Sequence, residues 1–454
     1  MNDNTFYAGA AKVKTTPPLG TRINGDFVTH YANYIHDDLY SKAIVMQNGD
    51  VRIAFVVVDI CVMLKEFVDG VKASITDATG IPASHILVSS THTHAAGSVA
   101  DVHLGSVDPG YSKKLPGLIL ESVLSALENL RPAKIAFDSI QVPEHLLCRR
   151  YRMDPGYVSV NPVSGEPDQI KTNPFGAENL INHSIAPVDP ELSYFALKGL
   201  DGEWIALLAN YSLHYVGDWA NGTISADYFG VFADEIARLL QTGDDFVGIM
   251  SNGTSGDVNI WDFLNPDRYP TENFAKSRLI GTDLAKQIFE TTNEIRWQTN
   301  PVLSALYADI EIQVVKPGEE DLRSAAKVVS EADYENIVVD QLGLKQLYAR
   351  EQLLLNDFSD TKTCPVQCFK IGTGIIGALA GEFFSETGLR LKSEIEAPHY
   401  FTISMANGNV GYVPPVAEMA LGGYETWRCR YSCLVGEAEA VIREKLMVLA
   451  KQLI

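Results

Sequence analysis

The chain has 454 residues, of which 46% are hydrophobic and 20% charged, and its formal net charge is −21. This composition excludes a disordered chain, and the length predicts two lobes or one large α/β domain. The strong negative charge argues against nucleic acid or an anionic membrane surface as a partner.

The polar residues Met1–Thr5 contain neither the basic nor the apolar region of a secretory signal. No apolar run reaches the length of a membrane span, so no membrane insertion is expected. Six cysteines in a chain of this length do not predict a disulfide framework. We therefore expect a cytoplasmic protein with reduced thiols.

Two strand-like runs, Leu39–Gln47 and Val51–Met63, are separated by Asn48-Gly49-Asp50, which favours a hairpin. The second run is apolar on both faces up to Asp59, as in a central strand. A buried aspartate needs a partner. Asp59 is therefore predicted either to support a metal-ligating histidine or to cap the helix that follows.

The segment Ile86–Gly97 is an apolar run that ends in His92 and His94. In an extended strand these two side chains would leave the backbone on the same side. Such a pair suits a metal ligand beside an acid/base or substrate-binding group. The alternative is a histidine pair exposed on the rim of a strand. Helical patterns at about 64–79 and 112–130 flank this strand and predict an α/β fold, a layered mixed β-sheet core with flanking helices.

Periodicity fades over residues 148–190, which are predicted to form an active-site loop or lid. This segment begins with Arg149 and Arg150, an unusual basic cluster in so acidic a chain. Arginines near a site would clamp a carboxylate or polarise a carbonyl, and solvated surface arginines are the alternative.

A second apolar strand, Trp204–His214, also ends in a histidine. In an open α/β sheet, ligands bind at the carboxyl ends of the strands. A third strand, from Val247, opens into a loop of small residues that contains Thr254 and Ser255, whose donors could hold an oxyanion. Asp227 lies near the cap of a helix that runs to about residue 240.

Helices are predicted over 274–294 and within 318–357. An apolar run that begins at Ile375 leads to Glu382, which is the third polar residue, after the histidines, predicted to lie at the end of a strand. The chain then passes through Gly411-Tyr412-Val413 and Tyr424 to a last helix at 436–454. No linker separates a second domain, so one domain over 1–454 is expected.

The ordered segments resemble the catalytic domain of the neutral/alkaline (non-lysosomal) ceramidases, which are zinc-dependent amidases, and most closely the short bacterial proteins of that superfamily. The resemblance runs from about Tyr7 to Tyr424. The segments that carry it are Thr91-His92-Thr93-His94, Arg149-Arg150, Asn210–His214, Ile224–Asp227, Gly256-Asp257-Val258, Gly381-Glu382 and Gly411-Tyr412-Val413.

The resemblance implies one zinc ion per chain, with the ligands His92, His214, Glu382 and Tyr412. It implies that His94 contacts the reacting amide and that Arg149, with Arg150 beside it, supports the reaction. Two imidazoles, a carboxylate and a phenolate suit zinc, which would acidify a bound water. Ser255 is predicted as part of the oxyanion site, and the predicted substrate-binding residues are Asp227, Thr254 and Tyr424.

Three departures from the ceramidases shape the functional prediction. Their serine, considered a nucleophile, aligns near Asn252-Gly253, so metal-activated water is favoured over a covalent serine. The ceramidases also have a C-terminal β-sandwich domain and a secretion signal, and we expect neither in this sequence. A small, non-ceramide amide is therefore the expected substrate.

The leading hypothesis is a zinc-dependent hydrolase that cleaves a C–N amide bond of a small molecule. Two alternatives stay open: a metal-dependent esterase or lactonase, and a non-catalytic metal-bearing binding protein. A homo-oligomer is possible.

Overall fold

The structure is a computed structural model that describes residues 5–454. The predicted absence of a secretory signal falls mainly on residues 1–4, which lie outside the described residues. The strands are β1 (Phe6–Lys14), β2 (Arg22–Ile23), β3 (His30–Tyr31), β4 (Tyr34–Ile35), β5 (Tyr40–Asn48), β6 (Val51–Val58), β7 (Ile86–Ser90), β8 (Arg131–Gln141), β9 (Leu147–Cys148), β10 (Arg150–Met153), β11 (Ser159–Val160), β12 (Pro167–Asp168), β13 (Lys171–Thr172), β14 (Ile181–Ser184), β15 (Glu191–Gly199), β16 (Trp204–Tyr211), β17 (Thr223–Ile224), β18 (Val247–Asn252), β19 (Val258–Asn259), β20 (Leu303–Gln313), β21 (Thr361–Ile371), β22 (Gly374–Leu379), β23 (Glu382–Phe383), β24 (His399–Ile403) and β25 (Tyr412–Val413). The helices are α1 (Lys65–Thr79), α2 (Pro109–Glu128), α3 (Asp227–Leu239), α4 (Ala275–Thr291), α5 (Glu319–Glu331), α6 (Gln341–Asn356), α7 (Ser385–Glu394), α8 (Val416–Met419) and α9 (Ala438–Leu453).

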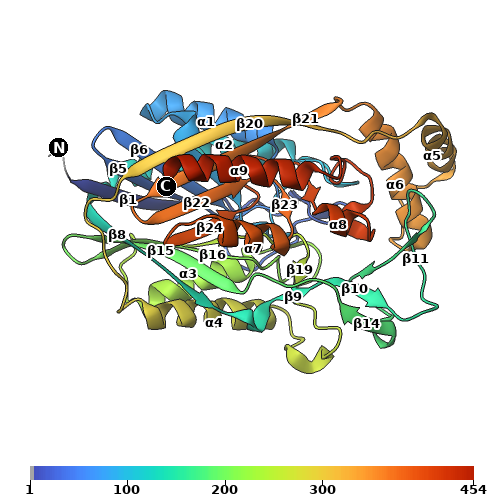
Figure 1. Cartoon of the computed structure of the whole chain (residues 1–454), viewed down its shortest axis with the longest axis horizontal. Coiled ribbons are helices and arrows are strands. Elements are labelled where there is room, and N and C mark those ends of the chain that lie inside the picture. Colours follow the sequence, from blue (N-terminus) through green and yellow to red (C-terminus); the bar gives the residue numbers. More distant parts are fainter. Residues whose placement is uncertain (1–4) are drawn as a thin grey trace.

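A mixed eight-stranded sheet, in the order β18-β16-β15-β8-β1-β5-β6-β7, organises the fold. Its two halves are joined where β1 pairs with β8 over only two residue pairs, Tyr7 with Pro132 and Ala8 with Arg131. From this junction the halves spread apart (Figure 1). A second sheet, β20-β21-β22-β24, packs against both halves, and side chains such as Phe55, Phe195 and Phe369 fill the core between the sheets.

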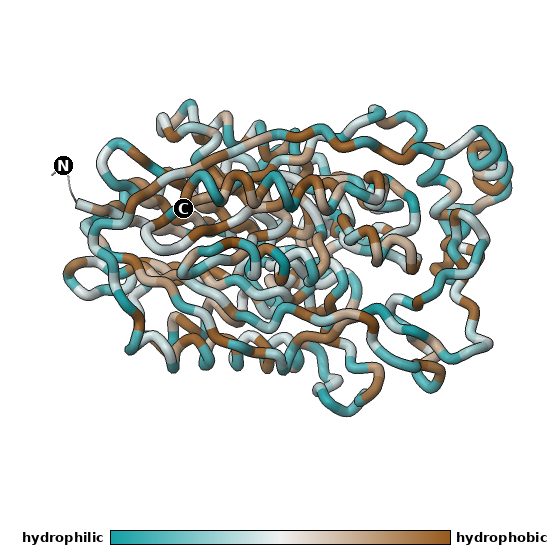
Figure 2. Tube along the Cα trace, in the orientation of Figure 1, coloured by the Kyte–Doolittle hydropathy of each residue, from teal (hydrophilic) through white to brown (hydrophobic). Residues whose placement is uncertain are grey.

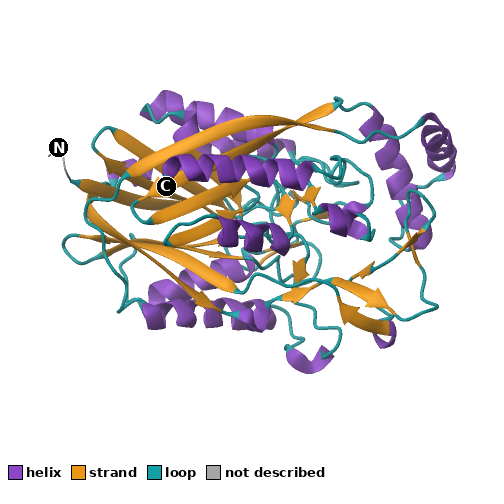
Figure 3. Cartoon of the chain, viewed as in Figure 1, coloured by secondary structure: helices purple, strands orange, loops and turns teal. Residues whose placement is uncertain are grey.

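Helices cover the outer faces of both sheets (Figure 3). One half of the large sheet packs on α1 and α2, the other half on α3 and α4, and α9 covers the second sheet. Figure 2 shows hydrophobic residues along much of the length of the strands, with hydrophilic residues frequent on the outer helices and loops. Burial of one face of each helix therefore holds the layers together, and the predicted layered α/β fold is confirmed.

The local elements agree with the sequence patterns where periodicity is strong. The β5–β6 hairpin turns at Gly49, which has a φ of 56°, and α1 ends at Gly80 in the left-handed conformation. The segment 148–190 is not a plain loop, because it forms short strands that include the three-stranded sheet β13-β10-β14. In the described part of the chain no helix is both long and apolar enough to cross a membrane, and all six cysteines are unpaired and buried.

Candidate functional site

The loops that follow several strands interlock at one end of the two sheets. The Thr91 N–H donates to the carbonyl of Val58 at 2.9 Å, which links the loop after β7 to the end of β6. The Ser404 N–H donates to Asn252 at 2.9 Å, which links β24 of the second sheet to β18 of the first. Segments far apart in the sequence therefore meet where the strands end, as expected for a ligand-binding edge.

His92 and His94 come together for a different reason from the one predicted. Strand β7 ends at Ser90, and His92 lies in the left-handed region with a φ of 72°. The two side chains therefore do not alternate along a strand. A tight turn brings the Nε2 atoms of His92 and His94 to 3.1 Å from each other.

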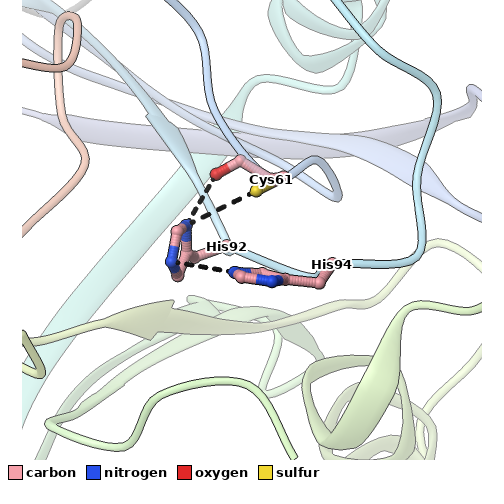
Figure 4. A group of neighbouring side chains, drawn as sticks. All are labelled: Cys61, His92 and His94. Carbon is pink, nitrogen blue, oxygen red and sulfur yellow. Dashed lines mark hydrogen bonds between the residues drawn. The ribbon is translucent and has the colours of Figure 1, made fainter. Parts of the chain in front are cut away.

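Hydrogen bonds to carbonyl groups fix which nitrogen of each histidine is free. His92 Nδ1 donates to the carbonyl of Cys61 at 2.8 Å (Figure 4), and His214 Nδ1 donates to the carbonyl of Ser255 at 3.2 Å. A carbonyl can only accept, so both rings carry a proton on Nδ1, and Nε2 is the nitrogen left to bind a metal. Metal-binding histidines are held in this way.

Glu382 completes a group of three residues that could bind a metal, together with His92 and His214. Its Oε2 lies 3.6 Å from His92 Nε2 and is a buried oxygen with no hydrogen-bond partner among the described residues. The ligand atoms of His92, His214 and Glu382 all lie within 4.8 Å of one another. A buried carboxylate oxygen without a donor is costly, and a cation held with the two imidazoles would satisfy it.

Cys61, His92 and His94 form a second group close enough to hold an ion. Figure 4 shows both Cys61 and its carbonyl on one side of the His92 ring, with His94 on the other. The Cys61 Sγ is 3.9 Å from His92 Nδ1, which already bonds to the nearer carbonyl oxygen. This competition favours the group of His92, His214 and Glu382 as the metal site.

Tyr412 and Arg149 lie beside this group. Strands β23 and β25 pair Glu382 with Tyr412, and Arg149 Nη2 donates to the Tyr412 hydroxyl at 3.1 Å. Burial and the charge of Glu382 raise the pKa of Tyr412 well above its usual value, although Arg149 opposes the shift. The role of Tyr412 as a fourth ligand stays a prediction.

Arg149 and Arg150 share one buried carboxylate. Glu425 accepts from Arg149 Nε and from Arg150 Nη1, each at 2.8 Å, and Arg150 also pairs with Glu418 at 3.0 Å. Burial opposes ionisation of Glu425, but the two arginines outweigh it and lower its pKa. The arginines are thus neither solvated nor free to clamp a carboxylate, and Arg150 positions Glu425 rather than reaching the cavity.

A cavity of about 400 Å³ opens at this site. Its wall includes five of the predicted residues: His94, Arg149, His214, Tyr412 and Tyr424. The segment 148–190 contributes Thr172, Asn173 and Phe175 to the same wall. The remaining lining is largely aromatic and apolar, with Phe27, Trp261 and Trp427 among it.

The structure corrects the predicted role of Asp59 and gives the contacts of three other predicted residues. Asp59 pairs with Lys42 at 3.1 Å and accepts from the Tyr40 N–H, so it neither supports a histidine nor caps α1. Asp227, Thr254 and Ser255 do not line the cavity, and neither do His92 and Glu382, so their roles in substrate binding and catalysis stay predictions. Ser255 instead orients His214 through its carbonyl, and its hydroxyl donates to Asn252 at 2.8 Å.

Two residues that the sequence reasoning missed hold His94 between them. The ring of Tyr215 stacks on the His94 ring with centroids 3.6 Å apart and planes 15° apart. Gly25 approaches from elsewhere in the chain with a φ of 118°, and a Cβ there would lie 2.6 Å from His94 Cγ. Burial, His92 and Arg149 lower the pKa of His94 well below its usual value, so its ring is neutral at pH 7 and has a lone pair.

We expect Gly25→Ala to displace His94, because the added methyl group would overlap the ring and strain a backbone that favours glycine. Catalytic activity should fall by about 10- to 100-fold, as for loss of other supporting residues, while metal content stays at the native level. Gly49→Ala, also at positive φ but in a hairpin with open space around it, is the matched control. Equal activity of the two variants would contradict the positioning role.

Asp227 provides a test of pH dependence. It is buried, with the Val216 and Tyr228 N–H groups donating to it, and burial raises its pKa to about 8. The folded protein therefore holds a proton that the unfolded chain releases above its usual pKa of about 4. Its contribution to stability is full below pH 4 and is lost as the pH rises to 8.

We expect the Tm of the native protein to fall more between pH 5 and pH 9 than the Tm of Asp227→Asn. Asparagine keeps an acceptor, tolerates the φ of 57° at this position and does not ionise. Thermal unfolding of both proteins at the two pH values measures the difference. Parallel falls in Tm would show that Asp227 does not titrate in this range.

The sequence reasoning also missed Cys61, Glu425 and two aromatic residues of the cavity wall, Phe175 and Trp261. Cys61 acts through its carbonyl, and a backbone contact leaves no signal in a sequence. Glu425 directly follows the predicted Tyr424, so its position was within the recognised pattern even though its pairing was not.

No family model matches the chain, but several solved structures share its fold, among them two ceramidases. A ceramidase complexed with C2 has a TM-score of 0.72 and 16% identity, covering 99% of this chain and 75% of that protein. The neutral ceramidase from Pseudomonas aeruginosa has a TM-score of 0.71 and 15% identity, covering 99% and 74%. Similarity over nearly all of this chain shows that it has the fold of the neutral ceramidases.

Proposed function

We propose that this protein is a zinc-dependent hydrolase that cleaves a C–N amide bond of a small substrate other than ceramide. The observation that carries the proposal is the convergence of His92, His214 and Glu382, in which both histidines use Nδ1 to bond to carbonyl groups and a buried Glu382 oxygen lacks a donor. The fold shared with amide-cleaving ceramidases adds support.

His92, His214 and Glu382 would hold the ion, and the Tyr412 hydroxyl is the proposed fourth ligand. A zinc ion at this position would supply a Lewis acid and lower the pKa of a bound water. Arg149 would favour an ionised Tyr412, because its Nη2 already donates to that hydroxyl.

His94 is the proposed general base and acid. Its neutral ring can accept a proton at pH 7 and return it to the leaving amine. Tyr215 and Gly25 fix the plane of the ring, which limits the reorientation needed during the reaction. Arg149 is anchored through Nε and Nη2, which leaves Nη1 to donate to the substrate carbonyl.

The cavity also narrows the choice of substrate. A volume of about 400 Å³ with aromatic walls suits a drug-sized molecule with apolar groups. Because Glu425 neutralises Arg149 and Arg150, a carboxylate near the scissile bond has no free cation to meet. We therefore favour an uncharged amide at the reacting centre.

The test is hydrolysis by protein loaded with one zinc ion per chain. A panel of N-acyl amides, each with its matched ester and lactone, should give turnover of amides that stops after chelation and returns with zinc. Preference for the esters would favour the esterase or lactonase hypothesis. Bound zinc without any product would favour a binding protein, and a chain that binds no metal would end the proposal.

A further inference from the structure

A second cavity of about 680 Å³ lies next to the candidate active site. The two cavities share three wall residues: Phe175, Ile260 and Trp261. The two cavities are therefore adjacent, with these three side chains between them. None of the metal-ligand groups among residues 5–454 lies in the wall of the second cavity.

Phe175 separates the two cavities. Its ring meets Trp261 edge-on at 5.0 Å and Phe263 at 4.9 Å, yet 60% of the residue remains exposed. An aromatic side chain left so exposed between two cavities offers a surface for a ligand to cover. Trp219 and Tyr269 add further aromatic surface to the second cavity.

Asp218 gives this aromatic cavity a charge. Its Oδ2 accepts the N–H groups of Lys276 and Ser277, at 2.8 and 3.0 Å, at the start of α4. Its Oδ1 is buried and has no hydrogen-bond partner among the residues that the structure describes. A buried carboxylate oxygen without a donor is costly, and a ligand that brings an N–H donor would satisfy it.

The wall of the cavity carries three carboxylates, Asp218, Asp262 and Glu178, against one lysine, Lys276. Asp262 is paired with Arg268 at 3.1 Å. The one lysine of the wall, Lys276, holds its ammonium 5.6 Å from the centre of the Tyr269 ring. Aromatic rings together with an unpaired carboxylate favour a cationic ligand, and the net charge of −21 would attract one.

We propose that the second cavity is a subsite for a protonated amine on the part of the substrate that lies away from the scissile bond. The ammonium group donates to Asp218 Oδ1 and its carbon chain lies against Trp219 and Trp261. This inference rests on the proposed function, since it names the substrate class as amides that carry a distal amine.

Binding of simple probes tests the subsite without turnover. Phenylbutylammonium, phenylbutanol and phenylbutanoate have the same hydrophobic part, and quenching of tryptophan fluorescence or calorimetry reports their affinities. We expect the ammonium ion to bind about tenfold more tightly than the alcohol and the carboxylate to bind weakest. Asp218→Asn should remove this preference, because asparagine keeps an acceptor for α4 but loses the charge.

Asp244→Asn removes an exposed carboxylate in the turn before β18 and is the control for net charge. Equal affinities for ammonium and alcohol, or a preference that survives Asp218→Asn, would overturn the subsite. Hydrolysis of amides without any ammonium preference would leave the proposed function standing and the subsite refuted. Ammonium binding with no hydrolysis of any amide, including amides with a distal amine, would refute the proposed function and, with it, the assignment of the site to a substrate.

Discussion

His92→Ala is expected to lose the bound metal and with it the hydrolytic activity. The Nε2 of His92 lies 3.6 Å from Glu382 Oε2, and the Cys61 carbonyl orients the ring through its bond to Nδ1. Alanine removes one of the two imidazole ligands, and the remaining ligands, His214, Glu382 and the proposed Tyr412, should hold zinc much less tightly. Loss of a residue that only supports a metal ligand lowers activity by up to about 100-fold. Loss of the ligand itself should lower it further.

Metal analysis of native and variant protein purified identically measures this effect. One zinc ion per native chain and little in His92→Ala is the expected result. The control is His183→Ala, which removes an exposed histidine of β14 and should leave both metal and activity unchanged. Equal zinc in native protein and His92→Ala would show that the ion lies elsewhere.

Glu425→Gln is expected to produce the largest loss of stability. Glu425 is fully buried and is the shared partner of Arg149 and Arg150, and it also accepts from the Thr172 hydroxyl at 2.8 Å. Glutamine leaves two buried guanidinium groups short of a negative charge. Removing one partner of a buried ion pair costs about 3–5 kcal/mol, and the free energy of unfolding in urea should fall by that amount.

A surface pair supplies the comparison for Glu425. Glu394 lies 3.5 Å from Arg443 with 38% of its side chain exposed, so Glu394→Gln should cost less than about 1 kcal/mol. Similar losses for the two variants would mean that water reaches the arginines around Glu425. Because Arg149 is anchored by Glu425, the activity of any folded Glu425→Gln protein should fall as well.

The sequence predicted the strongly periodic elements and several chemical groups of the site. The turn Asn48-Gly49-Asp50, the apolar runs and the helical pattern at about 64–79 placed β5, β6 and α1 closely. It did not predict β8, β15 or β20 as strands, although β8 pairs with β1 where the two halves of the large sheet meet. These strands contain polar residues, such as Lys134 and Asp138 of β8, so in the sequence they resemble surface segments. Only the neighbouring strands in the structure show that they belong to the sheet.

The site shows the same division. His92, His94, His214 and Glu382 were identified because each follows an apolar run, where chemistry gathers in α/β folds. The geometry behind the His92–His94 pair was wrong, since a residue at a φ of 72° breaks the alternation of a strand. Asp59 was assigned to a histidine because the sequence could not show that Lys42, one strand away, lies 3.1 Å from it.

The sequence by itself determined the layered α/β class and most of the polar groups at the ends of the strands, because hydrophobic periodicity and glycine positions act locally. Only the tertiary structure decided which nitrogens are free, which carboxylates lack partners and which arginines are neutralised. Those properties depend on contacts between residues up to about three hundred positions apart, such as Arg149 with Glu425, and on burial, which sets the energetic cost of every unpaired charge.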